Sequence, residues 1–337
     1  HLFMLRFTVR RLLQAVPTLF VLSILVFAWL RLLPGGPATA LLGDKATPER
    51  VAAMNEVLGL DDPIYVQYFG FLGRILSGDF GSSLITGDPV MEEVSWAFPA
   101  TLELSVAAMF LAVLFGIPMG YIAARFRGRF LDNATVVTTL VGVAVPVFFL
   151  GFLLKYIFTQ EMSLLPPSGR QDVLIDATRV TGIATLDGLL TGEFDATWDA
   201  MLHLILPAVA LASIPFAVIV RITRASVLDV QGEDFVRPAN SKGLTTQIVR
   251  KRHVLRNALL LVSTTIGLQT GLLMSGAVLT EKVVAWGGLG TLLEQAIQQR
   301  DYPRLQGLIL LFATVFVLVN LLVDISYAII DPRVRVR

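Results

Sequence analysis

Six long apolar stretches, separated by polar segments, dominate the pattern of residues along the chain. Each stretch has about 18 residues or more, and a helix of that length crosses the ~30 Å hydrocarbon core of a membrane. The stretches are Leu12–Leu30, Ala100–Ala124, Ala134–Phe158, Met201–Val220, Ala258–Leu279 and Leu305–Ile330. Because six such stretches do not fit an ordinary soluble core, the pattern predicts an all-α integral membrane protein with six transmembrane helices.

The composition agrees with this prediction. Hydrophobic residues make up 55% of the chain and charged residues 16%, against about 25% charged residues in a typical soluble domain. Cysteine is absent, which excludes disulfides, thiolate metal sites and cysteine nucleophiles. The first apolar stretch is followed by Leu33-Pro34-Gly35-Gly36-Pro37 and not by the small-residue cleavage site of a signal peptide, so we expect a retained helix.

The polar segments alternate in the sign of their charge. Basic residues gather before the first stretch, at 125–129, at 221–256 and at 333–337, whereas acidic residues gather at 44–93 and 172–199. Short loops rich in Lys and Arg remain on the cytoplasmic side of a membrane. We therefore predict a multi-pass protein of the plasma or inner membrane with both termini in the cytoplasm, in contact with lipid and without a nucleic-acid partner.

These stretches divide the chain into three parts. Residues 1–33 are the cytoplasmic N-terminus and the first transmembrane helix, and residues 34–99 are a small external subdomain. Residues 100–337 are a five-helix transmembrane core, with a cytoplasmic loop at 223–257.

Two outer segments carry helix signals of their own. Thr47-Pro48-Glu49 combines an N-cap residue, a proline suited to the first turn and a first-turn acid. The apolar residues that follow it have helical spacing, which predicts a helix there. A second short helix is expected over Leu292–Gln299.

The usual motifs of catalytic chemistry are missing from the chain. It has no Gly-x-x-x-x-Gly-Lys-Ser/Thr phosphate loop, no His-Glu-x-x-His run and no Gly-x-Ser-x-Gly elbow. His203, near the outer end of the fourth stretch, fits a hydrogen-bonded interface residue better than a metal ligand. We therefore predict a non-catalytic chain with no catalytic residue, no metal site and no bound cofactor of its own.

Few polar or ionisable residues lie inside the apolar stretches. Glu103 is near the outer end of the second stretch, and Asp324 is deep in the sixth, one turn after Asn320. An acid within a membrane is costly, and it marks a functional site or a buried pair. For Asp324 we favour structural pairing, with Asn320 in the same polar network, because two separated acids make a poor proton relay.

The fifth stretch has a milder polar face. Thr265, Gln269 and Ser275 are candidates for lining a water-filled path. The alternative is helix packing, because Gly267 and Gly271 form a small-xxx-small pair of the kind found between membrane helices. Gly116 and Gly120 form the same pair in the second stretch.

The loop between the fourth and fifth stretches is the most informative segment. It runs Gly232-Glu233-Asp234-Phe235-Val236-Arg237-Pro238-Ala239-Asn240-Ser241-Lys242-Gly243-Leu244 and continues to His253-Val254-Leu255-Arg256-Asn257-Ala258. This order resembles the coupling loop of binding-protein-dependent ABC importers. Other segments are similar to the B-type permeases of dipeptide and oligopeptide importers, in shared order along almost the whole chain: Leu33–Ala38, Leu58–Asp61, Gly78–Gly81, Pro99–Leu104, Arg300–Pro303 and Val319–Asp324.

A short helix in this loop fits a groove on a soluble partner. Phe235 and Ala239 lie four residues apart, on one helix face, and Gly243 allows the chain to turn. By resemblance, the residues that contact an ATPase subunit are Glu233, Asp234, Phe235, Ala239, Lys242 and Gly243. Pro238 departs from the family pattern, because a proline inside a helix kinks it or moves its start. Without the resemblance, the basic loop also suits anionic lipid headgroups.

The resemblance implies a type I ABC importer permease fold and an assembly. A second homologous permease forms a heterodimer with this chain, two ATP-binding subunits carry ATP and Mg, and an extracytoplasmic solute-binding protein delivers short peptides. The same family includes importers of nickel, glutathione and other small solutes, which stay open as alternatives. From other classes, a proton-coupled secondary transporter works without ATPase subunits, and a membrane anchor assembles proteins without transport.

Overall fold

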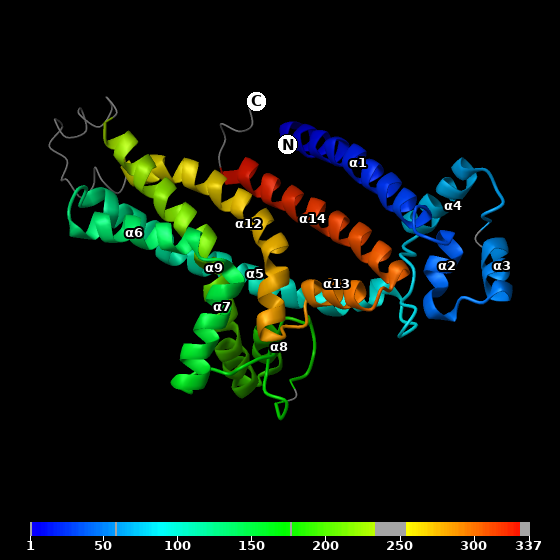
Figure 1. Ribbon diagram of the computed structural model, residues 1–337. Helices are drawn as coiled ribbons and strands as arrows, with labels where there is room; N and C mark the ends of the chain where they lie inside the picture. The colour runs from blue at the N-terminus through cyan, green and yellow to red at the C-terminus, as the bar shows by residue number, and fades with distance from the viewer. Residues whose placement is uncertain (1, 58, 176, 233–253, 331–337) are drawn as a thin grey trace. The chain divides into compact units, whose positions relative to one another are not determined.

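The computed structural model describes residues 2–57, 59–175, 177–232 and 254–330 (Figure 1). Over these residues the chain is helical, apart from loops and one isolated antiparallel bridge between Ser82 and Pro89. The all-α class predicted from the sequence is confirmed.

The apolar stretches correspond to helices of the expected length. Four regions of the described chain are long and apolar enough to cross a membrane singly: Leu12–Arg31 within α1 (Leu2–Arg31), α5 (Val90–Arg125), α9 (Phe194–Gln231), and Tyr302–Leu322 within α14 (Tyr302–Ile330). Two bent pairs bring the total to six: α6 (Phe130–Ala144) with α7 (Val147–Lys155) and the π-helical turn η2 (Tyr156–Glu161), and the two halves of α12 (Arg256–Val284). Each predicted stretch falls on one of these six elements.

The third span is broken and not straight. Its two halves meet at Pro146, directly before α7, and are bent by 102°. A proline has no backbone N–H and disfavours the helical conformation for the residue before it; here Val145 adopts an extended conformation and ends α6. The third span is therefore kinked at this proline.

The chain divides into two compact units, each of which is described separately below. The first comprises His1–Pro99 with Gly287–Leu322, and the second comprises Ala100–Trp286 with Val323–Arg337. The predicted division at residues 34–99 concerns the side of the membrane on which a segment lies, and it stays a prediction.

In the second unit, α9 is the central helix. It packs against α6, α7, α8 (Ala184–Thr191) and α12 (Figure 1). The interior is apolar and filled by side chains such as Leu104, Ile219, Val262 and Trp286, each at most 2% exposed. Many neighbours in this core are alanines, which allow helices to approach closely.

In the first unit, α1 contacts α2 (Gly36–Leu42) and α4 (Ile64–Leu76). The helix α2 also contacts α3 (Pro48–Val57), and the short turn η1 (Gly43–Lys45) connects the two along the chain. One apolar cluster joins Phe27, Phe71 and Leu310. A second joins the start of α5 to α13 (Leu289–Gln298) and α14.

Buried polar contacts also hold the first unit together. The Asp301 carboxylate, 1% exposed, accepts hydrogen bonds from Ser83 Oγ at 2.6 Å and from the backbone N–H of Leu84. Arg304 pairs with Glu93 at 2.8 Å. These bonds attach the start of α14 to the segment between α4 and α5 and to the first turn of α5.

The helix signals of the outer segments are confirmed, with shifted ends. Thr47 Oγ1 accepts the backbone N–H of Arg50, and α3 begins at Pro48 as the capping signal predicts. The helix α13 begins three residues earlier than predicted and ends one residue earlier. The helices α2 and α4 were not predicted from the sequence.

Candidate functional site

The loop predicted to meet an ATPase subunit follows α9 and precedes α12. The residues assigned to that contact, Glu233, Asp234, Phe235, Ala239, Lys242 and Gly243, lie outside the described residues, as does Pro238, so their role stays a prediction. The structure does describe the helix ends from which the loop departs. We call these ends the loop platform: the end of α9, the turn between α5 and α6 with the first turn of α6, and the start of α12.

An ion pair joins two parts of the loop platform. Asp132, in the first turn of α6, is 3% exposed, and its carboxylate accepts hydrogen bonds from Arg224 Nε at 2.6 Å and Nη2 at 2.9 Å. The backbone N–H of Gly128 donates a third bond at 2.9 Å. Two parallel bonds from one guanidinium fix orientation as well as distance. The turn before α6 is thereby bonded to α9, two helical turns before α9 ends.

Beside this pair, α5 and α9 are in close contact. A Cβ atom added to Gly120 would lie 2.6 Å from the carbonyl oxygen of Val220 and from Cβ of Thr223. A Cβ atom added to Gly116 would lie 3.0 Å from Ile219 Cγ2. The small-xxx-small pair of the second stretch is therefore a helix-packing contact.

Apolar residues attach the C-terminal end of the loop, where it joins α12, to the same platform. Val254, two residues before α12, and Ala258, in the first turn of α12, form a buried cluster with Val227 of α9 and Ala124 of α5. Both ends of the loop thus depart from one packed group of helix ends.

The exposed side of the platform is basic. Arg125, Arg127 and Arg129 line a hollow of about 560 Å³ together with Leu228 and Gln231 of α9. Such a surface suits an acidic protein surface or anionic lipid headgroups.

The predicted pathway residues lie on α12. Thr265 and Gln269 are half-buried, and Thr265 Oγ1 donates to the carbonyl oxygen of Leu261 at 3.1 Å, within its own helix. Ser275 belongs to the same helix, but its side chain lies outside the described set. These observations do not distinguish pathway lining from helix packing, so the lining role stays a prediction.

Of the three predicted intramembrane polar residues, Glu103 has defined partners. Its side chain is buried and accepts Arg170 Nη2 at 2.6 Å, Thr185 Oγ1 at 2.8 Å and the backbone N–H of Thr185 at 2.9 Å. Arg170 also donates to the carbonyl oxygen of Gly182. Asn320 is half-buried, and the side chain of Asp324 lies outside the described set, so their shared network stays a prediction.

The segment that supplies Arg170 is ordered by a second buried acid. The Asp187 carboxylate accepts hydrogen bonds from the backbone N–H groups of Thr181 and Gly182, and from Thr181 Oγ1. Burial disfavours its charged form, but these hydrogen bonds outweigh that cost and hold the pKa of Asp187 below its usual value. Nearby, the buried His203 ring lies 2.9 Å from the carbonyl oxygen of Asp199, as expected for a hydrogen-bonded histidine.

Several of these residues had no signal in the sequence. Asp132 and Arg224 are far apart along the chain, and each lies beside other charged residues. Glu281, fully buried in α12, accepts a hydrogen bond from Thr101 Oγ1 at 2.5 Å, yet in the sequence it precedes Lys282 as an ordinary helix-end acid. The one cue in the sequence to a buried role for Glu281 is that its charge falls on an apolar helix face.

Two family models match almost the whole chain. Residues 116–336 match the model described as binding-protein-dependent transport system inner membrane component, and residues 4–105 match the model of its N-terminal region. The chain therefore belongs to the family of binding-protein-dependent transport system inner membrane components, the membrane-spanning permeases of ABC importers. It is accordingly a multi-pass inner membrane protein.

Individual relatives align over nearly the full length of both chains. The chain is 42% identical over 332 residues to the dipeptide transport system permease protein DppB of Alkalihalophilus pseudofirmus, covering 98% of this chain and 100% of that protein. It is 45% identical over 333 residues to the di/tripeptide transport system permease protein DppB of Pseudomonas aeruginosa, with 98% and 99% coverage. It is 38% identical over 332 residues to the glutathione transport system permease protein GsiC of Escherichia coli K12, again with 98% and 99% coverage.

Proposed function

We propose that this chain is the permease subunit of an ATP-driven importer of short peptides, with dipeptides as the main solute. What supports the proposal most is the identity of 42–45% to dipeptide and di/tripeptide permeases along 98% of the chain. The glutathione permease is less similar, at 38% over the same length. Glutathione is itself a short peptide, so the second candidate differs in solute and not in mechanism.

The proposed assembly follows the family. A second homologous permease completes the pathway as a heterodimer, two ATP-binding subunits hold ATP and Mg, and an extracytoplasmic solute-binding protein delivers the peptide. The termini and the loop platform lie on the cytoplasmic side, an orientation that the basic surface of Arg125, Arg127 and Arg129 supports.

The loop platform suggests how force from the ATPase subunits enters the helices. Movement of the loop acts first on the end of α9. The bond between Arg224 and Asp132 carries that movement to α6, and the close contact at Gly120 carries it to α5. Three helices then move together, as alternating access by rigid bodies requires.

A strain that lacks the gene tests the solute. Uptake of radiolabelled alanylalanine should disappear on deletion and return with the wild-type gene, and unlabelled dipeptides should compete better than glutathione. Uptake that glutathione suppresses more strongly than dipeptides would reassign the solute. Uptake that persists in vesicles with the purified chain alone would reject an ATP-driven importer in favour of a secondary transporter.

Crosslinking tests the contact with the ATPase subunits. Because the chain has no cysteine, Phe235→Cys or Lys242→Cys introduces a unique thiol. Either one should crosslink to an ATP-binding subunit through a short bifunctional reagent, whereas Leu25→Cys, exposed on α1, should not. If no position in the loop yields this crosslink, the loop does not meet the ATPase.

A further inference from the structure

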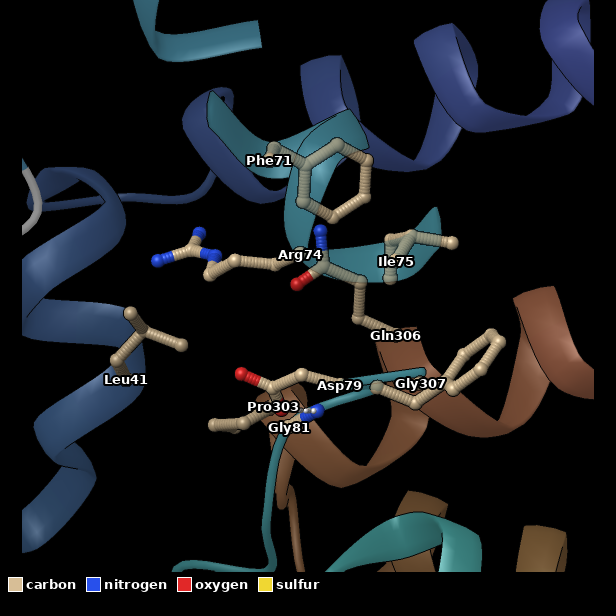
Figure 2. A pocket seen from close by; sticks show the side chains of 10 residues that line it. Leu41, Phe71, Arg74, Ile75, Asp79, Gly81, Pro303, Gln306 and Gly307 are labelled. Atoms are coloured by element: carbon tan, nitrogen blue, oxygen red, sulfur yellow. Dashed lines mark hydrogen bonds between the residues drawn. The ribbon is translucent and has the colours of Figure 1, made fainter. Parts of the chain in front are cut away.

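A small pocket in the first unit combines unpaired charges with apolar walls. It has a volume of about 180 Å³ and lies between α2, α4, the segment that follows α4, and the first turns of α14 (Figure 2). It belongs neither to the loop platform nor to the predicted pathway face of α12. An engineered cavity of about 150 Å³ holds benzene, so this pocket has room for an amino acid or a very small peptide.

The floor of the pocket is fixed by a close backbone contact. The Phe80 carbonyl oxygen lies so near Gly307 of α14 that a Cβ atom at position 307 would overlap with it. Gly81 adopts a positive φ of 85°, which glycine tolerates best, and its N–H donates to Asp79 Oδ1 at 3.0 Å. The Asp79 carboxylate is therefore held in place at the pocket.

Three polar side chains line the pocket: Arg74, Asp79 and Gln306 (Figure 2). Among the described residues, the Arg74 guanidinium and the Gln306 carboxamide have no hydrogen-bond or ion-pair partner, and Asp79 has no cationic partner. Arg31 contrasts with Arg74, because its guanidinium donates twice to Gln67 Oε1. Within the part of the chain that the structure describes, the pocket thus presents a guanidinium and an amide without hydrogen-bond partners, and a carboxylate without a cationic partner.

The remaining walls are apolar. Leu41 of α2, Phe71 and Ile75 of α4, and Pro303 of α14 face the same space (Figure 2). Water hydrates such walls poorly, so an apolar group of a ligand gains from contact with them. Arg74 and Asp79 are both exposed, so a ligand can reach them from solvent.

We propose that this pocket binds a small zwitterion that carries an α-carboxylate and an ammonium group, that is, an amino acid or a dipeptide. Arg74 pairs with the carboxylate, Asp79 with the ammonium group, and Gln306 with a peptide amide or the second carboxylate oxygen. The apolar walls receive a small side chain. This site is additional to the translocation pathway, and it does not depend on which solute the importer carries.

A fluorescent reporter at the pocket tests this binding directly. Leu41→Cys, labelled with bimane in the otherwise cysteine-free chain, is placed in the complete transporter in lipid nanodiscs without the solute-binding protein, and mock-labelled wild-type transporter gives the background. Alanine and alanylalanine should change the fluorescence in a saturable manner. Comparison of the two ligands decides whether the site prefers an amino acid or a dipeptide.

Variants of the pocket assign the groups. Arg74→Gln and Asp79→Asn should each weaken binding at least tenfold, whereas Arg50→Gln and Asp61→Asn, exposed charges of the same unit outside the pocket, should not. N-acetyl-alanylalanine should bind at least tenfold more weakly than alanylalanine to the parent transporter. The two ligands should bind Asp79→Asn with about equal affinity, because the partner of the ammonium group is gone. Alanylalanine amide should show the corresponding pattern with Arg74→Gln.

Two results would overturn the proposal: no saturable response to either zwitterion, or unchanged binding in Arg74→Gln and Asp79→Asn. Uptake by cells separates this outcome from failure of the proposed function. Normal dipeptide uptake with no response at Leu41 rejects the site and keeps the importer, whereas a response at Leu41 without dipeptide uptake keeps the site and rejects the solute assignment.

Discussion

The ion pair between Asp132 and Arg224 offers the most direct test of the loop platform. Arg224→Met keeps much of the side-chain length but leaves the Asp132 carboxylate with the Gly128 N–H as its one remaining bond of the three. Removing one partner of a buried pair costs about 3–5 kcal/mol. Because the Arg224 side chain is 28% exposed, water partly replaces it, and we expect the lower end of that range, about 3 kcal/mol.

The reverse substitution should cost less. In Asp132→Asn the amide oxygen still accepts one hydrogen bond, and the Arg224 guanidinium turns toward solvent. Hydrogen bonds to charged groups contribute about 1.5–3 kcal/mol, so we expect a loss of about 2 kcal/mol. The ion pair is already lost in either single variant. The double variant, Asp132→Asn with Arg224→Met, should therefore lose at least about 1 kcal/mol less stability than the sum of the two single losses.

Equilibrium unfolding in mixed micelles measures these three free energies. Arg221→Met is the matched control, because Arg221 is exposed on the same helix and its loss should change stability by less than about 0.5 kcal/mol. Coupling between helices is tested separately, by the ratio of ATP hydrolysed to dipeptide imported in reconstituted transporter. That ratio should rise in Arg224→Met and stay unchanged in Arg221→Met. Additive single losses, or an unchanged ratio in Arg224→Met, would refute a role of this pair in transmission.

Three further results are expected. Glu103→Ala removes the buried anion that holds Arg170 and should destabilise the protein by about 3 kcal/mol in the same unfolding assay; an effect below that of an exposed-residue control would contradict the burial of this pair. Gly120→Leu should disrupt the contact between α5 and α9 because its Cβ overlaps with the Val220 carbonyl, and normal expression and uptake would argue against that contact. Since the pKa of Asp187 is lowered on folding, its contribution to stability is present above about pH 4 and is lost as the pH falls through the folded value; Asp187→Asn should flatten this acid limb, and an identical pH profile would reject the assignment.

The positions of the spans could be predicted because a membrane imposes a length on apolar helices. Twenty apolar residues in succession are a signal that needs no knowledge of partners. The break at Pro146 within the third span also has a local cause, because the effect of a proline on the backbone does not depend on distant residues. The angle of 102° was not predictable, because it depends on what the two halves pack against.

Tertiary partners explain most of what the sequence did not reveal. Glu103 drew attention as an acid in an apolar stretch, but nothing local pointed to Arg170 as its partner. The helix α4 was missed because its aromatic and β-branched residues favour strands, and Gly70 and Gly73 weaken a helix. Packing of Phe71 and Tyr68 against Phe27 of α1 outweighs these local preferences.

The interior of the second unit bears on the proposal that a second permease completes the pathway. Its core is packed with apolar side chains, and the ion pairs Asp132–Arg224 and Glu103–Arg170 are separate from each other, because they share no residue. A charged peptide loses several kcal/mol for each unpaired polar group in such surroundings. A path through this core is therefore unfavourable, whereas a path along the surface of α12 would pass Thr265 and Gln269, which are half-buried. In the proposed assembly a second permease would close the other side of such a path, which gives a physical reason for the proposed heterodimer.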